Sequence, residues 1–211
     1  WGSRTKRLLL VARPPGTVWR MSSIVPAQFQ PPLPTDRILL REAPSDEAVP
    51  MDVLFVGGGP AGLCGAIELA RLVKAGNEAG GDDALGEVEI GVLEKAESLG
   101  QHSLSGAVVN PKPFLELFPD VPEAELQFRQ KVTGEAVYML SEHKARRLPT
   151  PPTMKNHGNY IASVAEICQW LGERAEGLGV NVFTGFPAAS LLIEDQRVQG
   201  VRTVPVGLNR D

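Results

Sequence analysis

The sequence predicts an α/β fold with a parallel sheet, and three neighbouring patterns lead to that prediction. A short apolar run at residues 52–56 reads as a strand, and three consecutive glycines follow at residues 57–59. A helical pattern starts at Pro60 and continues to about Lys74. Alternating apolar residues at 88–94 then predict a second strand, parallel to the first. The layout is Rossmann-like, in which a glycine-rich turn and a helix start bind a dinucleotide.

The composition is typical of a globular protein, with 43% hydrophobic and 22% charged residues among 211. That length suffices for one domain with a sizeable core. The formal net charge is −4, and because residues 1–35 contain basic residues but no acid, the rest of the chain is more acidic than the total. An acidic chain lacks the positive charge with which proteins bind nucleic acids, so we expect no nucleic-acid partner.

The first 50 residues predict an extended or disordered arm, because prolines recur from residue 22 to residue 50 with little hydrophobic periodicity. The chain begins with Trp1, and Met21 offers an alternative start. Residues 1–20 then read as upstream readthrough or a disordered tail, or else as an Arg-rich, acid-poor transit peptide.

The two cysteines, Cys64 and Cys168, fall within helical patterns and lack metal-ligand spacing. Each reads as a small buried apolar residue. The sequence therefore predicts no metal site in this chain and favours a reducing compartment.

Each glycine of the turn has a physical task. Gly57 permits the tight turn, Gly59 lets a pyrophosphate approach the backbone, and Gly62 lets the helix pack close to the strand. Pro60 and Ala61 occupy the first helical turn, where proline's missing N–H is harmless and free N–H groups face the phosphates. The alternative is a glycine-rich turn in an α/β protein that binds no dinucleotide.

The second strand ends on Glu94, where dinucleotide-binding folds place an acid that hydrogen-bonds the adenosine ribose. Glu94 lies farther from Gly62 than the roughly 20 residues that are usual, and the glycine- and acid-rich loop at residues 75–87 accounts for the excess. This acid disfavours a 2′-phosphate. The alternative is a solvated acid at a strand end. Lys95 follows and is a further candidate cofactor-binding residue.

The segment after Glu94 favours FAD over a nicotinamide cofactor. A nicotinamide dehydrogenase usually continues into another helix, whereas glycine and small residues here suit an extended chain beside a long, flat cofactor. The candidate cofactor-binding residues of this segment are Gln101, His102, Ser103, Ser105 and Gly106.

Four stretches resemble the electron transfer flavoprotein–ubiquinone oxidoreductases: DVLFVGGGPAGL, VLEKAESLGQHSLSGAVVNP, FLELFPD and MKNHGNYIASVAEICQWLGERAEGLGVNVFTGF. The resemblance runs in order through residues 51–211. GQHSLSGA and NHGNYI are much more specific than the glycine pattern, which many flavoproteins share. The resemblance implies a Rossmann-like FAD-binding fold of the glutathione-reductase type, with an additional β-hairpin or β-meander region. Residues 51–211 would be the N-terminal part of that domain, an incomplete domain.

The resemblance also implies partners and location. Electrons would pass from electron transfer flavoprotein through FAD and a four-iron four-sulfur cluster to ubiquinone. The protein would be monotopic, lying peripherally on the inner face of the mitochondrial inner membrane or on the bacterial cytoplasmic membrane. A cluster needs about four cysteine thiolates, so we expect its ligands beyond Asp211. We expect the chain alone to hold the ADP-binding half of the FAD site, to bind FAD poorly and to be inactive.

Two other functions are compatible with the residues. One is another membrane-associated FAD oxidoreductase, of the geranylgeranyl reductase or FixC type. The other is a non-catalytic dinucleotide-binding module. No catalytic residue is predicted.

Residues 109–160 are expected to border the quinone- and membrane-facing region. Apolar side chains crowd into residues 112–132, which predicts either a helix packed on the protein's own sheet or an apolar surface at a bilayer interface. Residues 136–140 and 144–148 predict a β-hairpin.

A polar cluster formed by His157, Gly158, Asn159 and Tyr160 is predicted to lie near the flavin ring or a quinone head. The alternative is a polar turn without a ligand.

The last part of the sequence predicts one helix and three strands. A capping-box sequence at residues 163–166 opens a helix that runs to about Leu178. Strands are predicted at residues 180–184, 188–194 and 196–204. In flavoproteins of the glutathione-reductase type a strand here passes the adenine, so the backbone near Ala189 is a candidate adenine contact.

Overall fold

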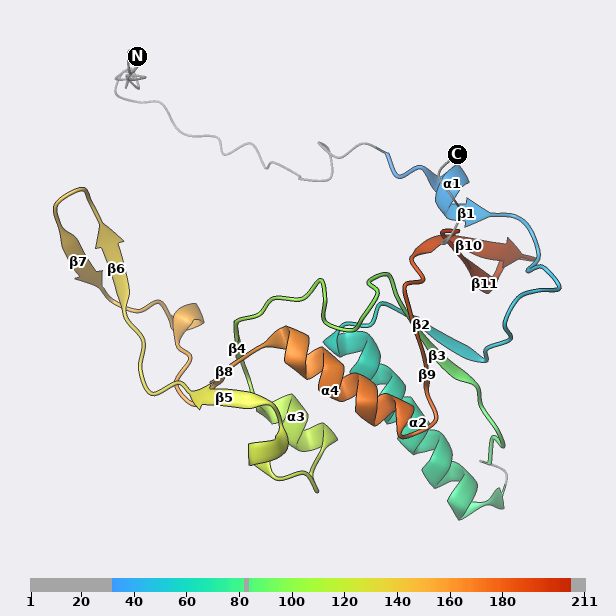
Figure 1. Cartoon of the computed structure of the whole chain (residues 1–211), viewed down its shortest axis with the longest axis horizontal. Helices are drawn as coiled ribbons and strands as arrows, with labels where there is room; N and C mark the ends of the chain where they lie inside the picture. Colours follow the sequence, from blue (N-terminus) through green and yellow to red (C-terminus); the bar gives the residue numbers. More distant parts are fainter. Residues whose placement is uncertain (1–31, 82–83, 206–211) are drawn as a thin grey trace, which may run out of the picture. The chain divides into compact units, whose positions relative to one another are not determined.

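A three-stranded parallel sheet of order β2–β3–β9 forms the centre of the fold in the computed structural model (Figure 1). The structure describes residues 32–81 and 84–205. The strands are β2 (Val53–Val56), β3 (Ile90–Glu94) and β9 (Asn181–Thr184), paired in parallel. The middle strand β3 is buried up to its last residue, as expected for a parallel strand covered on both faces. The predicted Rossmann-like α/β fold is confirmed.

Two helices, α2 (Pro60–Ala79) and α4 (Val164–Glu176), lie side by side against this sheet (Figure 1). Both bury an apolar stripe with the three- and four-residue spacing of an amphipathic helix. α2 runs beyond its predicted end at Lys74. Leu178, the predicted last residue of the second helix, lies past its end and is 36% exposed, because α4 ends at Glu176 and is capped by Gly177. The buried residues are Leu63, Ala66, Ile67 and Ala70 of α2, and Ile167, Cys168, Trp170, Leu171, Gly172 and Ala175 of α4.

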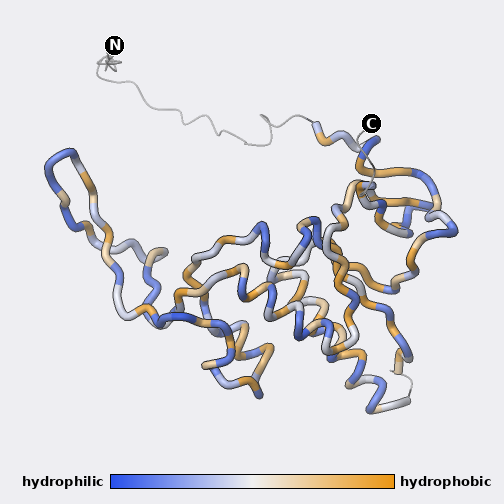
Figure 2. The backbone as a smooth tube through the Cα atoms, in the orientation of Figure 1, coloured by the Kyte–Doolittle hydropathy of each residue, from blue (hydrophilic) through white to orange (hydrophobic). Residues whose placement is uncertain are grey.

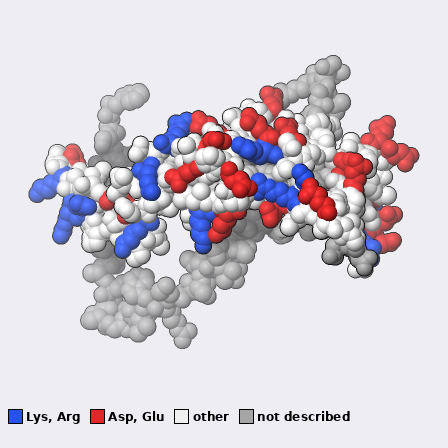
Figure 3. Space-filling model, turned by 90° about the horizontal axis from the view of Figure 1, so that it is seen from below, with Lys and Arg blue, Asp and Glu red and all other residues white. Residues whose placement is uncertain are grey.

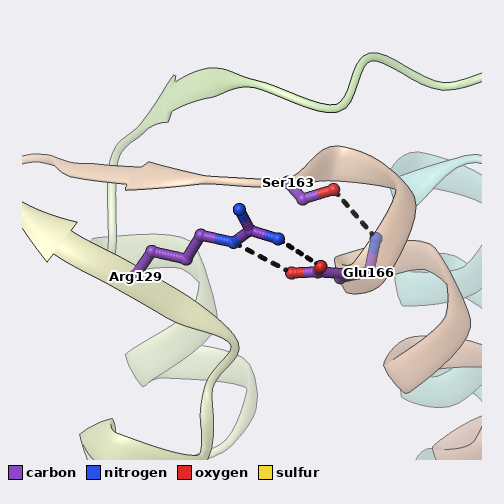
Figure 4. A network of polar contacts seen from close by, with 3 residues as sticks. All are labelled: Arg129, Ser163 and Glu166. Carbon is purple, nitrogen blue, oxygen red and sulfur yellow. Dashed lines mark hydrogen bonds and ion pairs between the residues drawn. The ribbon is translucent and has the colours of Figure 1, made fainter.

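The first turn of α4 forms only half of the predicted capping box (Figure 4). The Ser163 hydroxyl accepts a hydrogen bond from the Glu166 backbone N–H at 3.4 Å. The Glu166 carboxylate, however, pairs with the guanidinium of Arg129, and Figure 4 shows the two side chains facing each other. The acid therefore ties the helix start to the neighbouring strand.

That strand belongs to an antiparallel sheet of order β4–β8–β5, which the sequence did not predict. The strands are β4 (Ala107–Val109), β8 (Tyr160–Ala162) and β5 (Phe128–Lys131). Strands of three or four residues are too short to show an alternating pattern. Val108 and Ile161 are partners on the exposed face.

Residues 112–132 pack against the protein's own core, so the predicted apolar surface at a bilayer interface is wrong for this stretch. It contains α3 (Lys112–Leu117) and the short helix η3 (Glu123–Glu125). Phe118 is 1% exposed and Leu126 is fully buried. The Phe118 ring meets the ring of Trp170 edge to face at 4.8 Å. The alternative prediction, packing on the protein itself, is the one that the structure supports.

The predicted hairpin is confirmed as β6 (Val137–Leu140) and β7 (Ala145–Leu148). Neither strand contains a buried residue. In Figure 2 the β6 strand is largely hydrophobic, whereas the turn and much of β7 are hydrophilic. The hairpin therefore presents apolar side chains without burying them. A further short helix, η4 (Pro152–Met154), follows it.

The two predicted C-terminal strands are confirmed as β10 (Ala188–Glu194) and β11 (Arg197–Thr203). A third strand, β1 (Leu39–Leu40), pairs in parallel with β10 and follows the short helix α1 (Thr35–Ile38). The Ser190 hydroxyl adds a hydrogen bond to the Arg37 carbonyl at 2.7 Å.

Residues 36–50, which the sequence predicted as part of an extended arm, belong to the unit that spans residues 36–211. The sequence could not reveal this, because a two-residue strand has no recognisable period. The predictions of a tail, readthrough or transit peptide at residues 1–20 lie outside the described residues.

Replacing Phe118 by Ala should lower the free energy of unfolding by about 3–5 kcal/mol, because it leaves a cavity against Trp170. Leu140→Ala is the matched control: this side chain is 75% exposed, and its loss should change the free energy by no more than about 0.5 kcal/mol. Urea unfolding followed by circular dichroism measures both. Equal effects would contradict the assignment of residues 112–132 to the core.

Candidate functional site

The glycine turn between β2 and α2 has the geometry that its sequence predicted. Gly57 adopts a positive φ of 117°, a conformation that favours glycine. A Cβ built on Gly62 would lie 2.1 Å from the Gly57 carbonyl oxygen, so α2 approaches the turn too closely for any side chain there. A Cβ on Gly59, by contrast, would meet no atom within 4 Å. The space over Gly59 is therefore open to a ligand.

The start of α2 presents backbone N–H groups at this open space. Gly59 is the N-cap residue and Pro60 is the first helical residue. The first intrahelical bond runs from the Leu63 N–H to the Gly59 carbonyl at 3.1 Å. The N–H groups of Ala61 and Gly62 precede it, so they are the donors that helix geometry leaves for an anion.

Glu94, at the end of β3, joins the turn to the segment that follows it. One carboxylate oxygen accepts the Gly58 N–H at 2.9 Å and the other accepts the Ala96 N–H at 2.8 Å. A carboxylate offers about four lone-pair sites, so the two backbone bonds leave acceptor capacity for ligand hydroxyls. The alternative of a solvated acid at a strand end does not describe this residue.

A groove of about 290 Å³ crosses the carboxyl ends of the three parallel strands. Ligands of α/β proteins bind at this edge of the sheet. One side of the groove is apolar, and Glu94 and Lys95 contribute the charged side chains. Its lining residues are Val56, Gly57, Leu93, Glu94, Lys95, Phe186, Pro187 and Ala188. A larger groove, lined by residues of α2 from Ala70 to Glu78, lies away from the glycine turn.

Phe186 is a lining residue that the sequence did not predict. It is 41% exposed, its N–H donates to the Glu94 carbonyl at 2.9 Å, and its ring lies edge-on to Phe183 at 6.2 Å. The available sequence signal was its position two residues after the end of β9, because ligands of α/β proteins bind at the carboxyl ends of parallel strands. Ala189, the predicted adenine contact, lies within β10 beyond the groove lining, at an irregularity of the strand register between Ala188 and Ser190.

The predicted residues between Gln101 and Gly106 lie on a segment that is seated on the start of α4. The Val164 N–H donates to the Leu104 carbonyl at 3.0 Å, and the Ser103 hydroxyl lies 3.8 Å from the Cys168 sulfur. The side chains of Gln101, His102 and Ser105 are exposed, and Ser103 is half-buried. The segment is therefore held by its backbone and leaves most of its polar side chains free.

The cluster of residues 157–160 belongs structurally to the β5–β8 part of the fold. The Val132 N–H donates to the Asn159 carbonyl at 2.8 Å. The Tyr160 ring stacks on Phe128 at 4.9 Å, and its hydroxyl donates to the Glu123 carboxylate. That hydrogen bond raises the pKa of Tyr160. His157 is exposed, and Gly158 is half-buried with a φ of 90°. Their predicted contact with a flavin or quinone stays a prediction.

The two cysteines lie where helix patterns placed them. Cys168 is fully buried, and Cys64 is partly buried. Burial raises the pKa of both thiols, so neither is a strong nucleophile at neutral pH. Within residues 32–81 and 84–205, no group of three or more His, Cys, Asp or Glu side chains is arranged to hold a metal ion.

The described residues fit the nucleotide half of FAD. The open space over Gly59 can take a pyrophosphate between N–H donors, Glu94 has free acceptor capacity for ribose hydroxyls, and the apolar side of the groove suits a flat base. The set also fits the ADP part of other dinucleotides, and the acid at Glu94 disfavours a 2′-phosphate.

Curated proteins of high sequence similarity carry one name. The chain is 40% identical over 172 residues to the mitochondrial electron transfer flavoprotein-ubiquinone oxidoreductase of Dictyostelium discoideum. It is 41% identical over 170 residues to the Pseudomonas aeruginosa protein of the same name, and 39% identical over 163 residues to the human mitochondrial one. These matches cover 81%, 78% and 76% of the chain but 27%, 29% and 25% of the relatives. The resemblance predicted from the sequence is confirmed.

The chain spans between a quarter and a third of the length of these relatives. No protein-family model matches it. Among solved structures, a geranylgeranyl bacteriochlorophyll reductase-like protein of Thermoplasma acidophilum aligns with a TM-score of 0.49 and 21% identity, over 72% of this chain and 34% of the other. The chondrochloren halogenase CndH, described as a FAD-dependent halogenase variant, aligns with a TM-score of 0.48 and 19% identity, over 72% and 32%.

Gly62→Ala should lower the free energy of unfolding by about 1–3 kcal/mol, because the new methyl group meets a backbone oxygen that cannot move aside. Gly59→Ala is the matched control and should stay within about 1 kcal/mol of wild type, because the poorer N-cap is offset by the lower entropy of the unfolded chain. Denaturant titration measures both variants. Equal losses would show that the close approach at Gly62 is not the constraint.

Proposed function

We propose that this chain forms the nucleotide-binding half of the FAD site of an enzyme that transfers electrons from reduced electron transfer flavoprotein to ubiquinone. The observation that carries the proposal is the carboxylate of Glu94 bonded to the Gly58 N–H, beside a glycine turn with open space over Gly59. The identity of about 40% to proteins of that name supports the choice of reaction.

Each part of the site has a role in this proposal. The N–H groups of Ala61 and Gly62 hold the pyrophosphate, Glu94 accepts the ribose hydroxyls, and the groove beside Phe186 receives the adenine. Lys95, exposed at the same edge, adds a positive charge near the phosphates. When bound, FAD supplies one- and two-electron redox chemistry, and the protein supplies position and electrostatics.

The segment from Gln101 to Gly106 is assigned to the part of FAD beyond the pyrophosphate. Its backbone is held by α4, so its free polar side chains project from a fixed support. His157 and Asn159 are proposed to lie toward the flavin or the quinone. We assign no acid–base role to them, and no catalytic residue.

The remaining partners belong to the whole protein. The proposal includes a four-iron four-sulfur cluster and ubiquinone, and we assign none of the cluster ligands to this chain. Location on the inner face of the mitochondrial inner membrane or on the bacterial cytoplasmic membrane is part of the same proposal. None of the described helices is both long and apolar enough to cross a bilayer.

Within residues 109–160, the β6–β7 hairpin is the element that we propose faces the membrane. Tyr138 is 54% exposed, Met139 is 60% exposed and Leu140 is 75% exposed. Exposed bases follow at the turn and on β7, at Lys144, Arg146 and Arg147. In Figure 3, Lys and Arg predominate at the left end of the view, where the hairpin lies. Exposed apolar side chains beside bases suit an anionic membrane surface.

Glu94→Gln should weaken FAD binding about tenfold in the full-length protein, because one carboxylate acceptor becomes a donor and leaves a backbone N–H or a ribose hydroxyl unpaired. Glu97→Gln, an exposed acid on the same segment, is the matched control and should bind FAD like wild type. Titration of the apoprotein followed by flavin fluorescence measures both.

The same full-length preparation tests the reaction. Its bound flavin should be reduced, with loss of visible absorbance, when reduced electron transfer flavoprotein is added. A preparation without flavin would favour a non-catalytic module, and a flavin that this donor does not reduce would favour another FAD oxidoreductase.

Leu140→Glu should lower the fraction of full-length protein that sediments with vesicles of phosphatidylcholine and phosphatidylglycerol by at least about fivefold, because it puts a charge into the apolar contact. Leu115→Glu is the control, since Leu115 is a partly exposed leucine of α3, outside the hairpin. Equal sedimentation of wild type and Leu140→Glu would contradict the assignment.

A further inference from the structure

Leu99 lies between two glycines that belong to different elements. A Cβ built on Gly172, in α4, would lie 2.0 Å from one δ-carbon of Leu99. A Cβ built on Gly58, in the glycine turn, would lie 2.7 Å from its other δ-carbon. Real Cβ atoms do not approach other atoms so closely, so a side chain at either position would require Leu99 to shift.

Gly58 is also the residue that donates its N–H to Glu94. A Cβ on Gly58 would lie 2.9 Å from the Cβ of Glu94. Two side chains therefore lie against Gly58: Leu99 contacts it with a methyl group, and Glu94 accepts its N–H. The position of Leu99 thus limits where the turn can present that N–H.

The backbone next to Leu99 is anchored on α4. Gly100 has a φ of 79°, and a Cβ built there would lie 2.4 Å from the Ala165 carbonyl oxygen. The hydrogen bond from Val164 to Leu104 holds the following residues against the same helix start. Leu99 itself packs partly buried against the core. The backbone of this segment is therefore held on α4, and a push on Leu99 is taken up by its side chain, which lies between Gly172 and Gly58.

We propose that Leu99 is a positioning residue for the nucleotide site: it transmits the position of α4 to Gly58 and so fixes the hydrogen bond between Gly58 and Glu94. This inference rests on the proposed nucleotide site. Leu99 does not need to touch the ligand for this role. Close-packed interiors transmit displacements, because a neighbour pushed by a methyl group has no free volume to enter.

The test uses ADP, the part of FAD that the site is proposed to hold, titrated calorimetrically into the full-length protein after its FAD has been removed. Gly172→Ala should raise the Kd of ADP at least about threefold. Residues in contact are energetically coupled, and a coupling of ordinary size changes a Kd by about this factor. Leu99→Ala should also weaken ADP binding, because Gly58 loses its support. The double variant should bind ADP more tightly than Gly172→Ala, because the new methyl group no longer meets Leu99.

Gly177→Ala is the matched control in the same helix region. A Cβ there would meet only backbone oxygens of its own helix, the nearest at 3.3 Å, so ADP binding should equal that of wild type. Unchanged binding by Gly172→Ala, or a double variant no tighter than Gly172→Ala, would overturn the role of Leu99. Should Gly172→Ala fail to fold, unchanged ADP binding by Leu99→Ala overturns it equally.

Amide hydrogen exchange supplies a readout that a purely structural role would not move. The Gly58 N–H should exchange faster in Leu99→Ala than in wild type, while protection of the α4 amides stays the same. Unchanged exchange at Gly58 would overturn the inference. A wild-type chain that binds no ADP would instead overturn the proposed nucleotide site, and this inference with it.

Discussion

The hydrogen bonds of one carboxylate organise this part of the molecule. Glu94 ends the middle strand of the parallel sheet, accepts the N–H of Gly58 from the preceding turn, and accepts the N–H of Ala96 from the following segment. Charged acceptors make stronger hydrogen bonds than neutral ones. The two loops that border the candidate site are therefore fixed to each other before any ligand binds, so the proposed nucleotide would require little reordering of them.

Helix α4 supports both the core and the segment that follows Glu94. α4 lies beside α2 and also supports the segment after Glu94, through hydrogen bonds to the Leu104 carbonyl and the tight contact at Gly100. Arg129 joins the first turn of α4 to β5. The core and the candidate site thus share one helix, α4.

Features with a local signature could be predicted from the sequence. The glycine turn, Glu94, the capped start of α4, the β6–β7 hairpin and the strands β10 and β11 each occupy a short continuous stretch whose residue types determine its backbone. The β4–β8–β5 sheet could not be predicted, because its strands are defined by partners distant in the chain. The sequence of residues 112–132 indicated apolar side chains but not what they pack against. In the structure their partners include Trp170. Phe186 belongs to no motif, and its position just after the β9 strand was the one sequence signal for it.

The pairing of β1 with β10 constrains the order in which the chain can fold. The hydrogen bond from Ser190 to Arg37 joins residues 153 positions apart, so this contact closes a very long loop. Closing such a loop costs conformational entropy before the two-residue strand β1 gains any hydrogen bonds with β10. During synthesis, residues 36–40 emerge well before their partner strand exists. We therefore expect β1 to join this sheet only after β10 and β11 have paired with each other.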